Sequence, residues 1–210
     1  MPRLKVCGIT DAAFAVEAAR RGIDYLGLVF AEGSPRRVTE EQAREIVAAV
    51  RRGGTPAVPA GPRFVGVFVG HDVEKIKEVA SFVGIDVIQL HGDYGAYEIA
   101  MLKADGYEVW RLFGGHDVAV AQERDPPDAV LLDGRKGAQR GGTGMRADWS
   151  LVGPLKRAGR RVVLAGGISA ANVVEAAATG ADVIDVNSSI ETAPGVKSLA
   201  LLDELLRAGM

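Results

Sequence analysis

The feature that most constrains this chain is a regular alternation of short apolar segments with helix-like segments. Several of the apolar segments are continuous runs of Val, Ile and Leu, which is typical of strands buried on both faces of a sheet. We predict eight strands, at Leu4–Cys7, Tyr25–Val29, Phe64–Val69, Val87–Leu90, Glu108–Leu112, Ala129–Leu132, Arg161–Leu164 and Val183–Val186. Strands that alternate with helices pair in parallel through right-handed crossovers.

Helix-start signals lie between these strands. Asp11 is a candidate N-cap, and Thr39 and Gln42 have the spacing of a capping box. We expect helices after Asp11, after Thr39, and at Asp72–Phe82, Tyr94–Lys103, Asp117–Arg124, Trp149–Ala158, Asn172–Thr179 and Ser198–Ala208. No strong internal repeat is evident. An open, doubly wound sheet fits this alternation too, but eight units in 210 residues favour one α/β domain, a (β/α)8 TIM barrel over residues 1–210.

Composition excludes several functional classes. The formal net charge is -2 and the basic residues form no stripe, which argues against nucleic-acid binding. No apolar run approaches the ~20 residues of a membrane span, and no secretory leader is evident, so we expect a cytoplasmic protein. The single cysteine, Cys7, excludes an internal disulfide, and no His, Cys or carboxylate group has metal-ligand spacing.

Reactive side chains are concentrated where the predicted strands end, and this is the end of a barrel that carries the active site. Cys7 stands at the end of the first predicted strand and is either a buried small apolar residue or, as a thiolate, a general base. Asp133 ends the sixth strand with no helix directly after it, so a general acid is favoured over a helix cap.

The loops after the seventh and eighth strands predict a phosphate site. Barrels often bind phosphate there through backbone N–H groups and a short helix N-terminus. The candidate phosphate ligands in these loops are Gly166, Gly167, Asn187, Ser188 and Ser189, and Gly142 and Gly144, in the glycine-rich segment after the sixth strand, could add backbone amides to the same pocket. The guanidinium of Arg36 is a candidate for binding a planar carboxylate through two parallel hydrogen bonds. The alternative is that Arg36 is only an exposed charge in a loop. His91 is either structural or a contact in the substrate pocket.

Several segments, in this order, resemble the phosphoribosylanthranilate isomerase family of tryptophan biosynthesis. They are Lys5-Val6-Cys7-Gly8-Ile9-Thr10, Gly27-Leu28-Val29-Phe30, Ser34-Pro35-Arg36, Val65-Gly66-Val67-Phe68, Ile88-Gln89-Leu90-His91-Gly92, Leu131-Leu132-Asp133, Gly141-Gly142-Thr143-Gly144, Asp148-Trp149, Leu164-Ala165-Gly166-Gly167-Ile168 and Pro194-Gly195-Val196-Lys197. The chain departs from the family at Asn187-Ser188-Ser189, where Ser-Ser-Gly is usual, and at Ala147, where Phe is usual.

The resemblance implies a cofactor-free Amadori rearrangement of N-(5-phosphoribosyl)anthranilate, a small phosphosugar. It implies that Asp133 protonates the ring oxygen, that Cys7 removes the C2 proton, and that Arg36 holds the anthranilate carboxylate. Two alternatives remain: a histidine-pathway or bifunctional phosphosugar isomerase, and a non-catalytic phosphate-ligand-binding barrel. The former places Asp at the end of strand one, where this chain has Cys7. Monomer and homodimer are both compatible with a barrel of this size.

Overall fold

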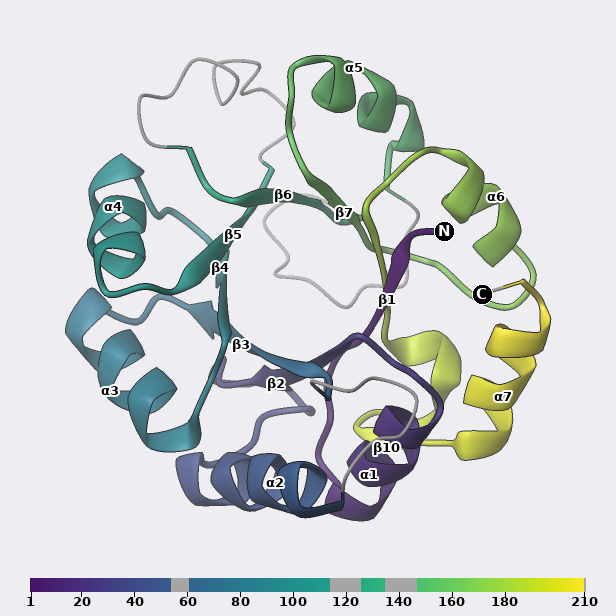
Figure 1. Cartoon of the computed structure of the whole chain (residues 1–210), viewed down its shortest axis with the longest axis horizontal. Helices are drawn as coiled ribbons and strands as arrows, with labels where there is room; N and C mark the ends of the chain where they lie inside the picture. The colour runs from purple at the N-terminus through teal and green to yellow at the C-terminus, as the bar shows by residue number, and fades with distance from the viewer. Residues whose placement is uncertain (54–60, 114–125, 135–146, 210) are drawn as a thin grey trace.

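The predicted barrel is present in the computed structural model, which describes residues 1–53, 61–113, 126–134 and 147–209. Eight strands pair in parallel in chain order and β8 closes onto β1 (Figure 1). They are β1 (Arg3–Val6), β2 (Tyr25–Val29), β3 (Arg63–Val69), β4 (Val87–His91), β5 (Glu108–Leu112), β6 (Ala129–Leu132), β7 (Val162–Leu164) and β8 (Val183–Val186). These bounds differ from the predicted ones by at most one residue at either end.

Helices surround the barrel on its outer side (Figure 1). They are α1 (Ala12–Arg20), α2 (Glu40–Gly53), α3 (Val73–Val83), α4 (Ala96–Ala104), α5 (Val152–Arg157), α6 (Val173–Ala178) and α7 (Leu199–Arg207). The helix expected at Trp149–Ala158 divides into a 3-10 turn, η2 (Trp149–Leu151), and α5. The helix expected at Asp117–Arg124 lies outside the described residues. No described helix has the length and apolarity to cross a membrane.

The helix-start signals act as predicted. The Asp11 side chain accepts a hydrogen bond from the Phe14 N–H at 2.7 Å. The Thr39 hydroxyl accepts from the Gln42 N–H, and the Gln42 side chain accepts from the Thr39 N–H. Each of these bonds satisfies a backbone donor that the helix itself leaves unpaired.

The sequence gives no hint of a short hairpin after β8. The 3-10 turn η3 (Ser188–Ile190) leads into β9 (Glu191–Ala193), which pairs antiparallel with β10 (Val196–Lys197). The hairpin brings Glu191 and Lys197 to the rim of the barrel, where both side chains are buried.

Packed side chains fill the barrel interior near the amino-terminal ends of the strands. Tyr25 and Trp110 meet edge to face with ring centroids 5.0 Å apart. Near them Glu108 pairs with Arg63 and Arg161, and Arg161 also donates to the Tyr25 hydroxyl. The amino-terminal end of the barrel is thereby filled, so the pocket lies at the opposite end.

A recurrent aspartate links each odd-numbered strand of the barrel to the next even-numbered strand by a hydrogen bond. Each of four aspartates stands immediately before an even strand and accepts a hydrogen bond from a backbone N–H near the start of the preceding odd strand. The pairs are Asp24 with Leu4 at 2.8 Å, Asp86 with Phe64 at 2.7 Å, Asp128 with Val109 at 2.8 Å and Asp182 with Val162 at 2.7 Å. The same hydrogen bond therefore recurs four times around the barrel, although the sequence shows no strong internal repeat.

Candidate active site

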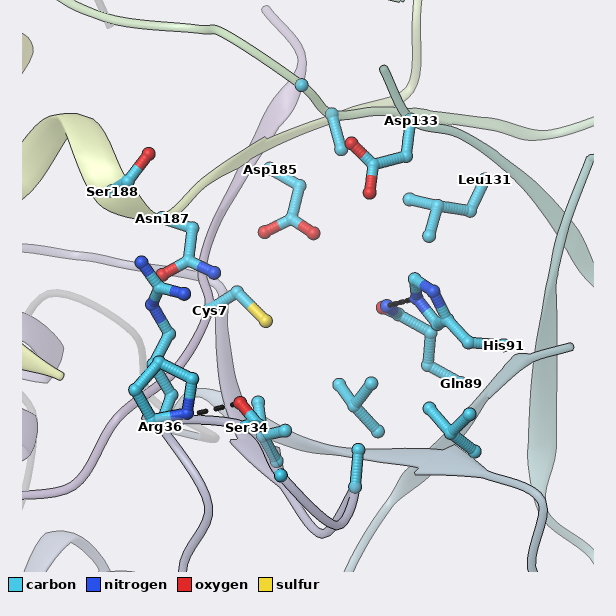
Figure 2. Close-up of a pocket in the computed structure, with 18 of the residues that line it drawn as sticks. Cys7, Ser34, Arg36, Gln89, His91, Leu131, Asp133, Asp185, Asn187 and Ser188 are labelled. Carbon is cyan, nitrogen blue, oxygen red and sulfur yellow. Dashed lines mark hydrogen bonds between the residues drawn. The ribbon is translucent and has the colours of Figure 1, made fainter. Parts of the chain in front are cut away.

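The main pocket opens at the carboxyl ends of the strands, where the sequence predicted it. Its volume is about 430 Å³, within the range of small-molecule sites. Residues of β2, β3, β4, β6 and β8 line it, together with residues that follow β1, β2, β6, β7 and β8 (Figure 2). Of the predicted site residues, those that line it are Cys7, Arg36, His91, Asp133, Gly166, Gly167, Asn187 and Ser188.

Cys7 and Asp133 both line this pocket, and each reaches it from a different strand end (Figure 2). Cys7 directly follows β1, and Asp133 directly follows β6. Cys7 is buried, whereas Asp133 is partly exposed. A thiol and a carboxyl group therefore border one pocket, and both are groups that can transfer protons.

The thiol of Cys7 lies in a buried, charged environment. Burial raises the pKa of Cys7, while Lys5 and Lys197 act in the opposite direction and leave it above its ordinary value. Gly27 on β2 packs directly against the thiol, because a Cβ at Gly27 would lie 2.9 Å from Sγ. The ammonium groups of Lys5 and Lys197 therefore favour the thiolate form, against the effect of burial.

Arg36 already has a carboxylate partner within the chain. Its Nε and Nη2 donate to the two oxygens of Glu191 at 2.9 and 2.7 Å, and both side chains are largely buried. The exposed-loop alternative for Arg36 is therefore excluded. Glu191 fixes one edge of the guanidinium, so a substrate carboxylate would have to approach its remaining N–H groups.

Lys197 determines how the side chain of Asn187 is oriented. Its ammonium donates to Asn187 Oδ1 at 2.7 Å and to Glu191 Oε1 at 2.7 Å. An ammonium only donates, so the amide oxygen of Asn187 has to face Lys197. The amide NH2 is then the group left to face the pocket that Asn187 lines.

The predicted phosphate ligands are only partly brought together. Gly166 and Gly167 have φ of 84° and 67°, a left-handed conformation that favours glycine, and the Asn172 amide donates to the Gly167 carbonyl at 2.9 Å. Ser189 is not among the described residues that line the pocket, and its Oγ is buried without a hydrogen-bond partner. Gly142 and Gly144 lie outside the described residues.

Three residues that the sequence analysis did not single out shape this pocket. The Nε2 of Gln89 lies 2.6 Å from the Nε2 of His91, and because an amide nitrogen only donates, this ring nitrogen of His91 accepts. Asp185 on β8 lines the pocket, and Lys5 on β1 pairs with it below the thiol. A lysine and an aspartate inside apolar strands were the available signal, since such charges are rarely buried unless they are paired. Among the described residues, no group of three or more His, Cys, Asp or Glu side chains could hold a metal ion.

Comparison with known proteins decides the family. The sequence matches the family model of N-(5'-phosphoribosyl)anthranilate (PRA) isomerase over residues 4–208. The chain belongs to this family. An N-(5'-phosphoribosyl)anthranilate isomerase from Rubrobacter xylanophilus is 40% identical, over 99% of this chain and 98% of the relative.

Solved structures of phosphoribosyl anthranilate isomerases have the same fold. The Thermus thermophilus enzyme superimposes with a TM-score of 0.82 at 34% identity, over 98% of this chain and 97% of that one. A further phosphoribosyl anthranilate isomerase, in complex with reduced 1-(o-carboxyphenylamino)-1-deoxyribulose 5-phosphate, gives a TM-score of 0.80 at 30% identity over 99% and 98% of the two chains. The family resemblance and the barrel fold expected from the sequence are both confirmed, and the chain is an isomerase of tryptophan biosynthesis.

Proposed function

We propose that this chain converts N-(5'-phosphoribosyl)anthranilate to 1-(o-carboxyphenylamino)-1-deoxyribulose 5-phosphate, with Asp133 as general acid and Cys7 as general base. The observation that carries this proposal is the placement of both residues on one pocket, in a chain of the PRA isomerase family. The pocket has the size for a ligand with an aromatic ring, a pentose and a phosphate.

Asp133 begins the reaction by opening the sugar ring. Its carboxyl group donates a proton to the furanose ring oxygen, and the bond between that oxygen and C1 breaks. The lone pair of the anthranilate nitrogen forms the C1–N double bond of a protonated Schiff base. General acid catalysis of this kind contributes roughly 10²–10⁴-fold to a rate.

Cys7 completes the rearrangement. Its thiolate removes the C2 proton, and the electron pair of that C–H bond forms a C1–C2 double bond as the Schiff base nitrogen becomes neutral. The enolamine then loses its 2-hydroxyl proton and gains a proton at C1, which gives the ketose. No electrons leave the substrate, so the step needs no redox carrier, and we propose no cofactor.

The two ends of the substrate are held by different parts of the rim. Arg36 has its guanidinium oriented by Glu191 and would bind the anthranilate carboxylate through its remaining donors. Backbone N–H groups of Gly166, Gly167 and Ser188, with the Asn187 side chain, would bind the phosphate. Binding energy from these remote groups holds the sugar between acid and base.

Cys7 favours this reaction over the related histidine-pathway rearrangement. Family resemblance places Asp in that position in the histidine-type and bifunctional barrels, and this chain has a buried thiol there. A non-catalytic phosphate-binding barrel has no need for an acid and a base facing one hollow. The cytoplasmic location and the choice between monomer and homodimer stay predictions from the sequence.

The proposed activity is tested by mixing the purified protein with N-(5'-phosphoribosyl)anthranilate and following the loss of anthranilate-type fluorescence. We expect multiple turnovers without added metal or cofactor, and a product with the mass of the substrate. The histidine-pathway aminoaldose serves as the parallel substrate. Turnover of that compound alone, by folded protein, would contradict the proposal.

A further inference from the structure

Lys5 lies in the barrel interior directly below the proposed catalytic thiol. It is the third residue of β1 and its side chain is fully buried. Residues two apart on a strand point to the same face, so Lys5 and Cys7 both point inward, with Lys5 on the side away from the pocket mouth. Its Nζ is 2.7 Å from Oδ2 of Asp185, which stands opposite Lys5 in the register of β1 with β8.

The ammonium of Lys5 has two neighbours rather than one. Its charge also acts on the thiol of Cys7, two residues further along the chain and on the same face. Asp185 in turn lines the pocket, and its second oxygen, Oδ1, is buried with no hydrogen-bond partner among the described residues. The three side chains are all buried, and the ammonium of Lys5 is paired with the carboxylate and acts on the thiol.

Stability alone does not explain this pair. Removing two charges from water costs about as much as their attraction returns, and apolar residues of similar size are often equally stabilising. Two strand positions that could carry Leu and Val instead carry an ammonium and a carboxylate beneath the reactive sulfur. A charge in that place changes the chemistry of the sulfur more than it changes the packing of the barrel.

We propose that Lys5 is a positioning residue of the reaction: its buried ammonium, held by Asp185, faces Cys7 and favours the thiolate form that removes the substrate proton. This inference rests on the proposed role of Cys7, but it concerns the ionisation of the thiol and can be measured without substrate.

The charges around the thiol determine in which direction the pKa of Cys7 changes when the ammonium of Lys5 is removed. Burial raises the pKa of Cys7, Lys5 opposes that rise most strongly, and Lys197 on β10 opposes it more weakly. Asp185 on β8 adds to the rise, and Arg36 is a further cation that interacts with Cys7. Removing the ammonium of Lys5 therefore leaves the burial effect and Asp185 less opposed, so the thiol should ionise only at a higher pH.

The single cysteine makes this ionisation directly measurable. Alkylation by iodoacetamide, followed by mass spectrometry over a range of pH, reports Cys7 alone because the chain has no other cysteine. In Lys5→Met we expect the alkylation profile to move to higher pH by at least about one unit, so that alkylation below the midpoint slows about tenfold. The control is Lys156→Met, which removes a lysine whose pair with Asp182 lies on the outer surface. A folded Lys5→Met protein with the wild-type profile would overturn the proposal.

A second measurement on the wild type covers the case in which Lys5→Met does not fold. We expect the ¹⁵Nζ resonance of Lys5 to shift over the pH range in which Cys7 ionises, and that shift to be absent in Cys7→Ser. A Lys5 resonance that does not respond to ionisation of the thiol would overturn the proposal. Failure of the proposed function gives a different result, in which both thiol measurements come out as expected but the wild type does not turn over the substrate.

Discussion

Replacing one of the recurrent aspartates should lower the free energy of unfolding, and a matched variant can separate the loss of the acceptor oxygen from the loss of charge. Asp24 accepts the backbone N–H of Leu4 at 2.8 Å, and Leu4 is only 4% exposed. In Asp24→Ala that donor loses its partner at the start of β1, which costs about 1–3 kcal/mol. For a chain of 210 residues, a loss of about 2 kcal/mol lowers Tm by roughly 4–8 °C. Urea unfolding followed by circular dichroism measures the free energy of unfolding directly.

The matched control is Asp24→Asn, because its amide oxygen can still accept the Leu4 N–H. We expect it to lose less than half of the free energy that Asp24→Ala loses. An Asp24→Ala protein within about 0.5 kcal/mol of the wild type, the range of an unimportant surface substitution, would refute the reasoning. Equal losses in the two variants would show that the charge of Asp24, and not its acceptor oxygen, stabilises the barrel.

Three further predictions follow from the contacts in the pocket. Gly27→Ala places a methyl group 2.9 Å from Sγ of Cys7, so we expect turnover to fall about 10–100-fold with the far-ultraviolet circular dichroism unchanged; wild-type turnover would contradict the placement of the thiol. Burial raises the pKa of Glu191, but hydrogen bonds from Arg36 and Lys197 outweigh it and hold the pKa below its usual value. The stability due to that carboxylate is therefore complete above about pH 4.3, the unfolded value, and is lost as the pH falls through the lower folded pKa. Urea titrations from pH 3 to 7 should show that the free energy of unfolding falls on the acid side in the wild type and does not in Glu191→Gln. An equal dependence of the free energy of unfolding on pH in the two proteins would count against the ion pair. Finally, a substrate without its 5'-phosphate should react with kcat/KM lowered at least about 100-fold, because remote binding energy is lost; equal kcat/KM values would exclude a phosphate site.

Local patterns predicted most of the fold because each strand and helix is encoded by adjacent residues. The helix starts at Asp11 and Thr39 are examples, since their partners are three residues away. Strand bounds were predicted equally well, because both faces of a barrel strand are buried and the apolar run ends where burial ends. Cys7 and Asp133 could be assigned to the same pocket because all barrel strands end on one face.

Features that depend on pairs of residues far apart in the chain were not predictable in the same way. Lys5 pairs with Asp185 across 180 positions, and Arg36 with Glu191 across 155. The four recurrent aspartates were missed for a related reason. Their hydrogen-bond partners lie about 20 residues back, on the preceding strand, and the residues around them share no motif beyond Asp before a strand.

The pKa of Cys7 also could not be read from the sequence. Position left open whether Cys7 is a buried apolar residue or a general base; burial raises its pKa and the nearby cations only partly oppose that rise. Ionisation of the thiol depends on the balance between desolvation and charges contributed by β1, β8 and β10, and that balance exists only in the folded barrel.

The most direct test of the acid–base assignment is steady-state turnover of N-(5'-phosphoribosyl)anthranilate by the wild type, Cys7→Ala and Asp133→Asn under one set of conditions. Both substitutions keep similar side-chain size, and circular dichroism establishes that the proteins are folded. We predict that the wild type turns over and that kcat falls about 100-fold or more in each variant, the loss expected for one acid or base group. A variant that keeps the wild-type kcat would contradict the role proposed for the residue it replaces, and a folded wild type without turnover would contradict the proposed function itself.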